Sequence, residues 1–186
     1  MTVNYPQPGA ERSALLAQIR EKALFRGEFT LSSGLKAGYY VDLRRINLHG
    51  KTAPLVGRVM LDTVKELDFD AVGGLTMGAD PMATAIMYAA LAQGRELDAF
   101  VVRKADKAHG LQRRIEGPDI KGRRVLIVED ASTTGNSPLA AVEAAREAGA
   151  EVVAVACIIE RGAAKAIEAA GIPYYAAYNE SDLLGV

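Results

Sequence analysis

The residues best suited to chemistry follow an apolar run in the second half of the chain. Two carboxylates, Glu129 and Asp130, come directly after residues 125–128, and a short polar loop follows them. That loop consists of Ala131, Ser132, Thr133, Thr134, Gly135, Asn136 and Ser137. A helix beginning there directs free backbone N–H groups and a positive dipole end at one spot, which suits a phosphate. The neighbouring carboxylates can accept hydrogen bonds from sugar hydroxyls or face a hydrated cation. The stretch therefore predicts a site for a ribose 5-phosphate.

The alternative for this stretch is an ordinary strand-to-helix turn. Asn136 or Ser137 is then the predicted helix cap, with Pro138 near the first helical position. Each feature is common alone, but two acids, two threonines, a glycine and a cap in succession favour a binding loop. The loop is not a P-loop, because the Gly-Lys-Ser/Thr ending is absent.

A basic cluster after the apolar run 99–102 is the second candidate. It contains Arg103, Lys104, Lys107, His109, Arg113 and Arg114. A solvated surface loop is the alternative, since most charged runs simply face water. This run, however, leaves a predicted strand at the ligand-binding face, so we expect a loop that closes over a polyanion. Its cations would neutralise a departing pyrophosphate, and His109 would donate a hydrogen bond or a proton to it.

Two weaker candidates are a glycine-rich turn and a tyrosine. The turn at 73–81 suits either tight packing or diphosphate binding, and the sequence does not favour one of these over the other. Tyr40 is a packing residue or one wall of a pocket for a flat ring.

Alternating strands and helices must position these residues. Apolar runs predict strands at 71–74, 99–102, 125–128, 152–159 and 174–177. Helical spacing predicts helices at 11–25, 55–64, 80–93, 138–148 and 163–170. The alternation predicts an α/β fold in which a parallel sheet is flanked by helices on both faces. Ligands bind outside the carboxyl ends of such strands, where Arg103, Lys104, Glu129, Asp130 and Arg161 would share one crevice.

The N-terminal part does not fit this alternation. We expect a loose arm at 1–10, a helix, and an extended segment at 29–42 that together form a small hood over residues 1–48. Residues 49–186 would form the α/β core, and the whole chain one structural domain.

Composition limits the possible partners and the compartment. The chain has 186 residues, a net charge of −1 and an isoelectric point near 6.2. This balance gives no electrostatic case for binding nucleic acid or an acidic membrane. The single cysteine, Cys157, lies in an apolar run, so no internal disulfide forms and a reducing, cytoplasmic location is expected. No apolar run is long enough to cross a membrane, and the N-terminus carries no signal pattern.

Three motifs resemble a known family. The segment 129–137 looks like the phosphoribosyl-diphosphate signature of the type I phosphoribosyltransferases. Residues 29–34, followed by 39–42, are similar to the hood motif of the orotate phosphoribosyltransferases, and residues 103–110 to their catalytic loop. The resemblance spans residues 25 to 162 and implies the type I phosphoribosyltransferase fold with an N-terminal hood.

The resemblance implies a reaction and a role for each matching residue. The 5-phosphoribosyl group would pass from 5-phosphoribosyl 1-diphosphate (PRPP) to orotate, giving orotidine 5-monophosphate and diphosphate in pyrimidine (UMP) biosynthesis. The 5-phosphate would bind at 133–137, and Glu129 and Asp130 would hold the ribose hydroxyls. The diphosphate would bind Arg103, Lys107, His109 and, from the second subunit of a homodimer, Lys104. Arg161 would contact orotate, with Thr133 near the base. Mg²⁺ would bridge diphosphate and ribose hydroxyls without direct protein ligands.

Two positions depart from the commoner family pattern. Ser32 stands where many members have a lysine, and Met77–Gly78 where many have an aromatic residue and a lysine. The second departure implies that diphosphate contacts come from backbone N–H groups and from the basic loop.

Two other functions compete with orotate transfer. A purine or uracil phosphoribosyltransferase would need the same sugar-phosphate loop, and only the hood motif and Arg161 favour a carboxylated pyrimidine. A PRPP-sensing regulator that binds nucleic acid would carry a basic surface or an additional domain, which this composition does not indicate.

Overall fold

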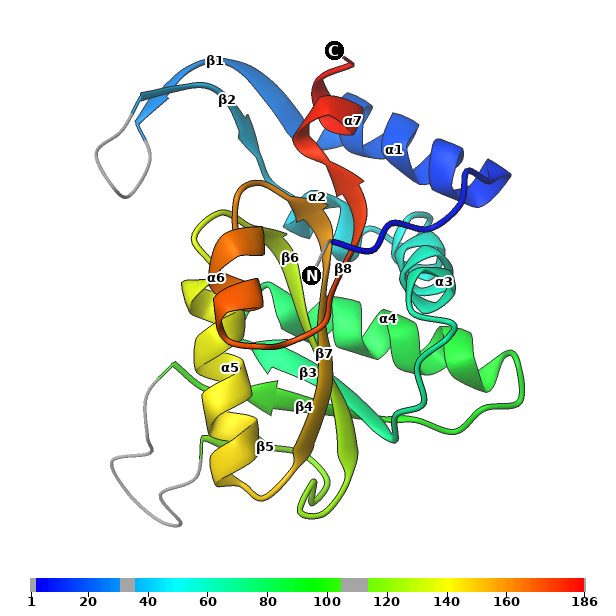
Figure 1. Ribbon diagram of the computed structural model, residues 1–186. Coiled ribbons are helices and arrows are strands. Elements are labelled where there is room, and N and C mark those ends of the chain that lie inside the picture. Colours follow the sequence, from blue (N-terminus) through cyan, green and yellow to red (C-terminus); the bar gives the residue numbers. More distant parts are fainter. Residues whose placement is uncertain (1–2, 31–35, 105–113, 186) are drawn as a thin grey trace.

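A six-stranded sheet forms the centre of the protein (Figure 1). The computed structural model describes residues 3–30, 36–104 and 114–185. The strands follow the order β5 (Ile115–Glu116), β4 (Asp98–Val102), β3 (Ala71–Leu75), β6 (Arg124–Ser132), β7 (Glu151–Glu160) and β8 (Tyr174–Asn179). All neighbours are parallel except β4 and β5, which are antiparallel. The predicted α/β fold with a parallel sheet is confirmed.

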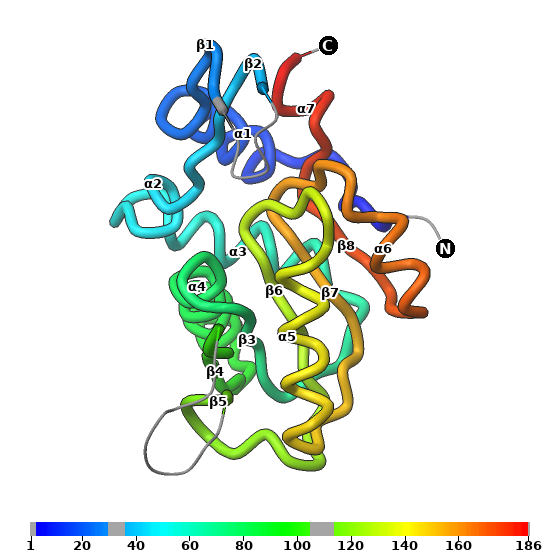
Figure 2. Tube along the Cα trace, turned by 90° about the vertical axis from the view of Figure 1, so that its left-hand side faces the viewer, coloured from blue at the N-terminus to red at the C-terminus, as the bar shows by residue number. Residues whose placement is uncertain are grey.

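Helices cover both faces of this sheet. α3 (Ala53–Thr63) and α4 (Ala79–Leu91) lie on one face, and α5 (Asn136–Glu147) and α6 (Ala164–Ala169) on the other, as Figures 1 and 2 show. Residues of β6 alternate between the two resulting cores. Leu126 and Val128 join the core under α4, and Val125 and Ile127 join the core under α5. Because both faces are buried, the strand is apolar at successive positions.

The N-terminal part packs against the C-terminus. α1 (Ala10–Lys22) leads into a hairpin of β1 (Leu24–Thr30) and β2 (Lys36–Val41), followed by the short α2 (Arg44–Asn47). The C-terminal helix α7 (Glu180–Leu184) lies beside α1 (Figure 1). Leu15 and Ile19 of α1 join the same core as α3 and α4. The division at residue 48 stays a prediction.

Several local predictions differ from the structure. The arm is not loose at Asn4, whose backbone N–H donates to Tyr174 O at 2.8 Å and whose carbonyl accepts from Ala176 N at 3.0 Å. These bonds occupy the otherwise open edge of β8. The predicted helix 11–25 ends at Lys22, because the chain turns into β1 at Leu24. The short elements β5, α2 and α7 were not predicted, since their few residues carry no periodic pattern.

Within the described residues, no helix is long and apolar enough to cross a membrane.

Candidate active site

The two acids lie within the last part of β6, not in the loop after it. β6 extends to Ser132 and pairs with β7 through Ala131 opposite Ile159 and Ser132 opposite Glu160. The side chain of Glu129 is buried, with its residue only 7% exposed. Its Oε1 accepts from the backbone N–H of Asp130 at 3.1 Å. Strand pairing therefore fixes the backbone of both acids, and the strand predicted at 125–128 continues through them into the predicted loop, as far as Ser132.

The turn between β3 and α4 lies in close contact with the side chains of these acids. A Cβ atom at Gly78 would lie 2.8 Å from Glu129 Oε1 and 3.1 Å from Asp130 Cγ, so only glycine fits without displacing a carboxylate. Thr76 anchors the turn, because its Oγ1 donates to Asp80 Oδ2 at 2.7 Å and its N–H to Val102 O at 2.8 Å. The weak sequence candidate at 73–81 thus lies directly beside the acids.

Burial and like charge act on Glu129. Loss of solvation, followed by the negative charge of Asp130, raises the pKa of Glu129 to about 8. The backbone N–H of Asp130 and the charge of Lys104 act in the opposite direction. Near neutral pH the ligand-free site therefore holds a proton on this pair of acids. A cation or several hydroxyl donors at the site would favour the ionised form and displace that proton.

The loop from β6 to α5 leaves the start of that helix open. α5 begins at Asn136 with Gly135 as its N-cap, and within the described structure no side chain caps it. The prediction of Asn136 or Ser137 as cap was therefore wrong, and Pro138 is the third helical residue. Gly135 has φ +80°, a conformation that suits glycine, and a Cβ there would approach Ala166 Cβ to 3.1 Å. An uncapped helix start with exposed Thr133, Thr134, Asn136 and Ser137 around it suits a phosphate.

The base of the basic loop is fixed by strand pairing. The backbone N–H of Arg103 donates to Arg114 O at 2.8 Å, and Arg103 Nη1 lies 3.4 Å from Glu116 Oε1. The short strand β5, which the sequence did not indicate, therefore returns the loop to β4. Arg103 and Lys104 lie at the carboxyl end of β4, and Lys107 and His109 lie outside the described residues.

Arg161 follows β7 and turns toward the hairpin. Its backbone N–H donates to Ser132 O at 2.9 Å, and its Nε donates to Tyr39 Oη at 3.0 Å. Tyr40, the tyrosine singled out from the sequence, instead pairs its ring with Phe29 at 5.8 Å and is 37% exposed. Adjacent residues of a strand point to opposite faces, so the sequence could not decide which of the two tyrosines meets Arg161.

An exposed apolar groove lies next to the β3–α4 turn. Its volume is about 780 Å³, and it runs between the start of α3 and the outer side of α4. Met77, Tyr88, Leu91 and Leu48 expose much of their apolar surface at or near it. Exposed apolar surface of this kind marks an interaction site. Sequence reasoning missed this groove, because α4 carries apolar residues on both its inner and outer sides.

The described residues contain no group of three or more His, Cys, Asp and Glu side chains that could hold a metal ion. The acids of β6 form only a pair. Such a pair beside an uncapped helix start fits a hydrated Mg²⁺ that takes most of its ligands from a substrate. The acid pair and the start of α5 can thus hold a phosphorylated sugar.

Known proteins share this sequence and fold. The phosphoribosyl transferase domain family matches residues 46–170. Orotate phosphoribosyltransferase of Streptomyces avermitilis is 70% identical over 175 residues, which cover 92% of this chain and 96% of the relative. The structure of the Mycobacterium tuberculosis H37Rv orotate phosphoribosyltransferase in complex with PRPP aligns with a TM-score of 0.82 at 47% identity, covering 95% of this chain and 100% of that one. An adenine phosphoribosyl transferase from Trypanosoma brucei, 16% identical with a TM-score of 0.70, shares the fold.

Proposed function

This chain belongs to the orotate phosphoribosyltransferases of the phosphoribosyl transferase family, and from that premise we propose its reaction and the roles of its residues. The enzyme transfers the 5-phosphoribosyl group of PRPP to a ring nitrogen of orotate. The products are orotidine 5-monophosphate and diphosphate, in the synthesis of UMP. We place the enzyme in the cytoplasm, where a chain with one buried cysteine needs no disulfide.

The juxtaposition of the acid pair and the open start of α5 carries this proposal. The N–H groups at 133–137 bind the 5-phosphate, and Glu129 and Asp130 accept hydrogen bonds from the ribose hydroxyls. Arg103, Lys104, Lys107 and His109 bind the diphosphate, together with backbone groups of the β3–α4 turn. Arg161 contacts orotate, and Tyr40 lines the pocket for its ring.

The reaction proceeds through a transition state that resembles an oxocarbenium ion, so no protein nucleophile is required. The residues of the site hold C1 of the ribose between diphosphate and orotate, which replaces a bimolecular encounter by an oriented one. The cations of the basic loop stabilise the charge that develops on the leaving diphosphate. By covering the site, the same loop keeps water from attacking C1.

Phosphoribosyltransferases that use PRPP generally use Mg²⁺, and we extend this requirement to the present enzyme. Such an ion would neutralise part of the charge of the diphosphate. Glu129 and Asp130 would hold it through its water ligands or through the hydroxyls of the sugar. Their location on one strand gives a pair of carboxylates, which suits an ion that keeps most of its water and substrate ligands.

Loss of orotate absorbance, on addition of PRPP and Mg²⁺, tests the reaction. We expect turnover with orotate and none with uracil or purine bases, each followed by diphosphate release. Turnover with a purine or with uracil in place of orotate would assign the enzyme to another branch of the fold. A salt-dependent shift of labelled DNA or RNA, without any turnover, would favour the regulator instead.

We further propose that the enzyme is a homodimer in which Lys104 acts across the interface. The exposed apolar groove beside Met77 supports an interface next to the site. Within one chain, however, the charge of Lys104 already acts on Glu129, so action within a subunit is the alternative.

A hybrid of Lys104→Ala and Asp130→Asn chains, purified through two different tags, separates these alternatives. If Lys104 acts across the interface, one of the two sites is complete and the hybrid has about half of wild-type activity, as expected for a symmetric dimer. If Lys104 acts within its own subunit, neither site is complete and the hybrid is as impaired as the parent variants.

A further inference from the structure

Three segments far apart in the sequence meet at Arg161. The guanidinium of Arg161, just after β7, lies 4.6 Å from the ring centroid of Tyr39 on β2, and its Nε donates to Tyr39 Oη at 3.0 Å. The hydroxyl of Tyr39 in turn bonds to Oε1 of Glu180, the first residue of α7. The hairpin, the end of β7 and the C-terminal helix therefore share one line of contacts at the same end of the molecule (Figure 1).

In the two hydrogen bonds of the Tyr39 hydroxyl, the donor and the acceptor are fixed. A tyrosine hydroxyl has one proton, and because it accepts from Arg161 Nε, that proton is donated to Glu180. Burial, and then the hydrogen bond to Glu180, raise the pKa of Tyr39, which keeps the proton in place. Arg161 uses only Nε here, and no described residue takes a hydrogen bond from its two terminal nitrogens. Those nitrogens can receive a planar acceptor, such as a carboxylate, in a paired geometry.

The backbone of Glu180 is fixed by the strand before it and the helix after it. It follows Asn179, which pairs in register with Glu160, so Glu180 and Arg161 leave neighbouring parallel strands at the same level. A capping box between Asn179 and Asp182 fixes the start of α7. Arginines from α1 and β1 then hold the helix: Arg12 bonds to Asp182, Arg20 to Asp182 O and Leu183 O, and Arg26 to Leu184 O. The side chain of Glu180 is exposed, but it extends from a backbone that is fixed in this way. Its carboxylate can therefore restrain Arg161 through the hydroxyl of Tyr39.

We infer that Tyr39 and Glu180 are positioning residues for Arg161, and that the C-terminal helix thereby sets the affinity of the enzyme for orotate. The inference rests on the proposed function, in which Arg161 contacts orotate. Neither residue touches the substrate in this arrangement. They restrict the rotamers of Arg161 and so reduce the entropy that the side chain loses when the base binds.

The alternative is that these contacts only fasten the hairpin to the core. Tyr39→Phe separates the two ideas, because it keeps the ring under the guanidinium and removes only the hydroxyl. If the contacts position Arg161, KM for orotate rises about tenfold, as expected for one hydrogen bond to a charged group. The KM for PRPP and kcat then stay within about twofold, because the phosphate loop and the basic loop are untouched. If the contacts only fasten the hairpin, both KM values change together with a lower melting temperature.

Two variants at Glu180, one that keeps an acceptor and one that removes it, test the hydrogen bond from Tyr39. Glu180→Gln keeps an oxygen that can accept the tyrosine proton, so KM for orotate should stay within about threefold of wild type. Glu180→Ala removes the acceptor and should reproduce the effect of Tyr39→Phe. Tyr175→Phe removes a hydroxyl from β8, four residues before Asn179. It serves as the control and should leave both KM values unchanged.

A double-mutant cycle with Arg161→Ala makes the test decisive. If Tyr39 acts through Arg161, adding Tyr39→Phe to Arg161→Ala raises KM for orotate no further. A tenfold increase that persists in the Arg161→Ala background, or an unchanged KM in Tyr39→Phe alone, would overturn the inference while orotate turnover by the wild type leaves the proposed function standing. A wild-type enzyme without orotate turnover would overturn both.

Discussion

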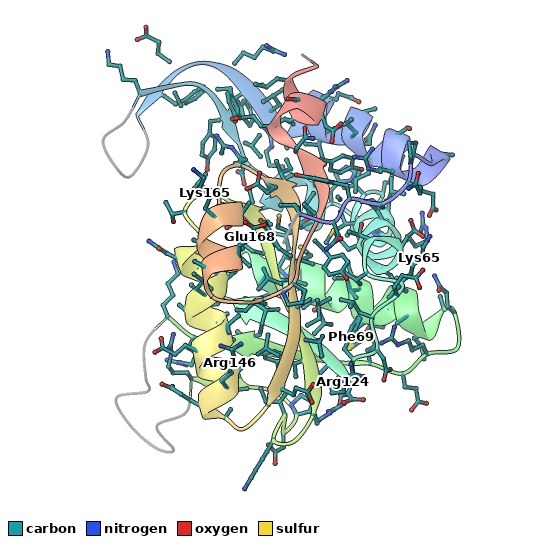
Figure 3. The ribbon with its side chains drawn as sticks, viewed as in Figure 1. Lys65, Phe69, Arg124, Arg146, Lys165 and Glu168 are labelled. Atoms are coloured by element: carbon teal, nitrogen blue, oxygen red, sulfur yellow. The ribbon has the colours of Figure 1, made fainter. Side chains whose placement is uncertain are left out.

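The two ends of the central sheet use charged residues in opposite ways. At the amino end, basic and acidic side chains are paired: Arg123 with Asp98, and Arg124 with Asp68 and Glu151. Arg124 and Phe69 lie at this end in Figure 3. At the carboxyl end, two carboxylates of β6 lie side by side, one of them buried, and the uncapped start of α5 follows. The charges at the amino end are paired within the protein, whereas no basic side chain among the described residues forms an ion pair with Glu129 or Asp130.

This difference indicates at which end of the sheet a substitution should have the larger effect. Ion pairs at the amino end are partly exposed, and such pairs contribute about 0–1 kcal/mol each. At the carboxyl end, burial and like charge raise the pKa of Glu129 to about 8, so the fold is less stable there than a neutral side chain would make it. The protein therefore retains an electrostatically unfavourable pair of acids at the site that we propose for the substrate sugar.

The largest contrast should come from two lysines. Lys107 belongs to the basic loop that follows Lys104 and lies outside the described residues, whereas the exposed Lys65 pairs with Asp62 at the end of α3 (Figure 3). Lys107→Ala should lower kcat by about 10²–10³, because it removes a cation that acts on the leaving diphosphate. Lys65→Ala should leave kcat unchanged in the same assay. A kcat for Lys107→Ala within about twofold of wild type would remove this lysine from the mechanism.

The two ends also offer a matched pair of aspartates. Asp130→Asn removes a charged acceptor for the ribose hydroxyls, so kcat/KM for PRPP should fall about 10- to 150-fold, the range for hydrogen bonds to charged groups. Asp98→Asn weakens the pair with Arg123 and should change the melting temperature only slightly and kcat/KM not at all. Equal losses of kcat/KM in both variants would mean that an aspartate affects activity equally at either end of the sheet.

Adding a methyl group to a glycine beside the acids, and to a glycine far from them, tests the site without changing any charge. Gly78→Ala places a Cβ 2.8 Å from Glu129 Oε1 and must displace the carboxylate, so KM for PRPP should rise about three- to tenfold. A Cβ at Gly50 meets nothing within 4 Å, and Gly50→Ala should be neutral in the same titration. If Gly78→Ala is also neutral, the spacing between the turn and the acids does not control substrate binding.

The smallest effect concerns stability against pH. An unfolded glutamate titrates near its ordinary pKa of 4.5, and folded Glu129 titrates at about 8. Between these values the folded protein binds more protons than the unfolded chain, so this residue lowers the free energy of unfolding as pH rises. Glu129→Gln removes that contribution. Its melting temperature relative to wild type, measured without ligand, should increase by a few degrees from pH 4.5 to about pH 6. A difference that does not vary with pH would contradict the raised pKa.

Much of the fold could be predicted because its signals are local. Apolar runs of strand length that alternate with segments of helical spacing predicted the parallel sheet. The order of acids, polar loop and helix led to the phosphate site that we propose. Glu129 and Asp130 became site candidates because two acids, two threonines and a glycine follow an apolar strand in succession. Short elements such as β5 and α7 carry no such signal, although β5 returns the basic loop to β4 and α7 presents Glu180.

The types and order of the residues set the available chemistry and the strand ends that carry it. That Tyr39 faces Arg161 while Tyr40 does not depends on the fold, since one residue along a strand reverses the direction of the side chain. The same holds for Gly78, whose role depends on how closely a turn after β3 approaches acids on β6. These choices depend on contacts between segments distant in the chain, and the types of residue within each segment leave such contacts undetermined.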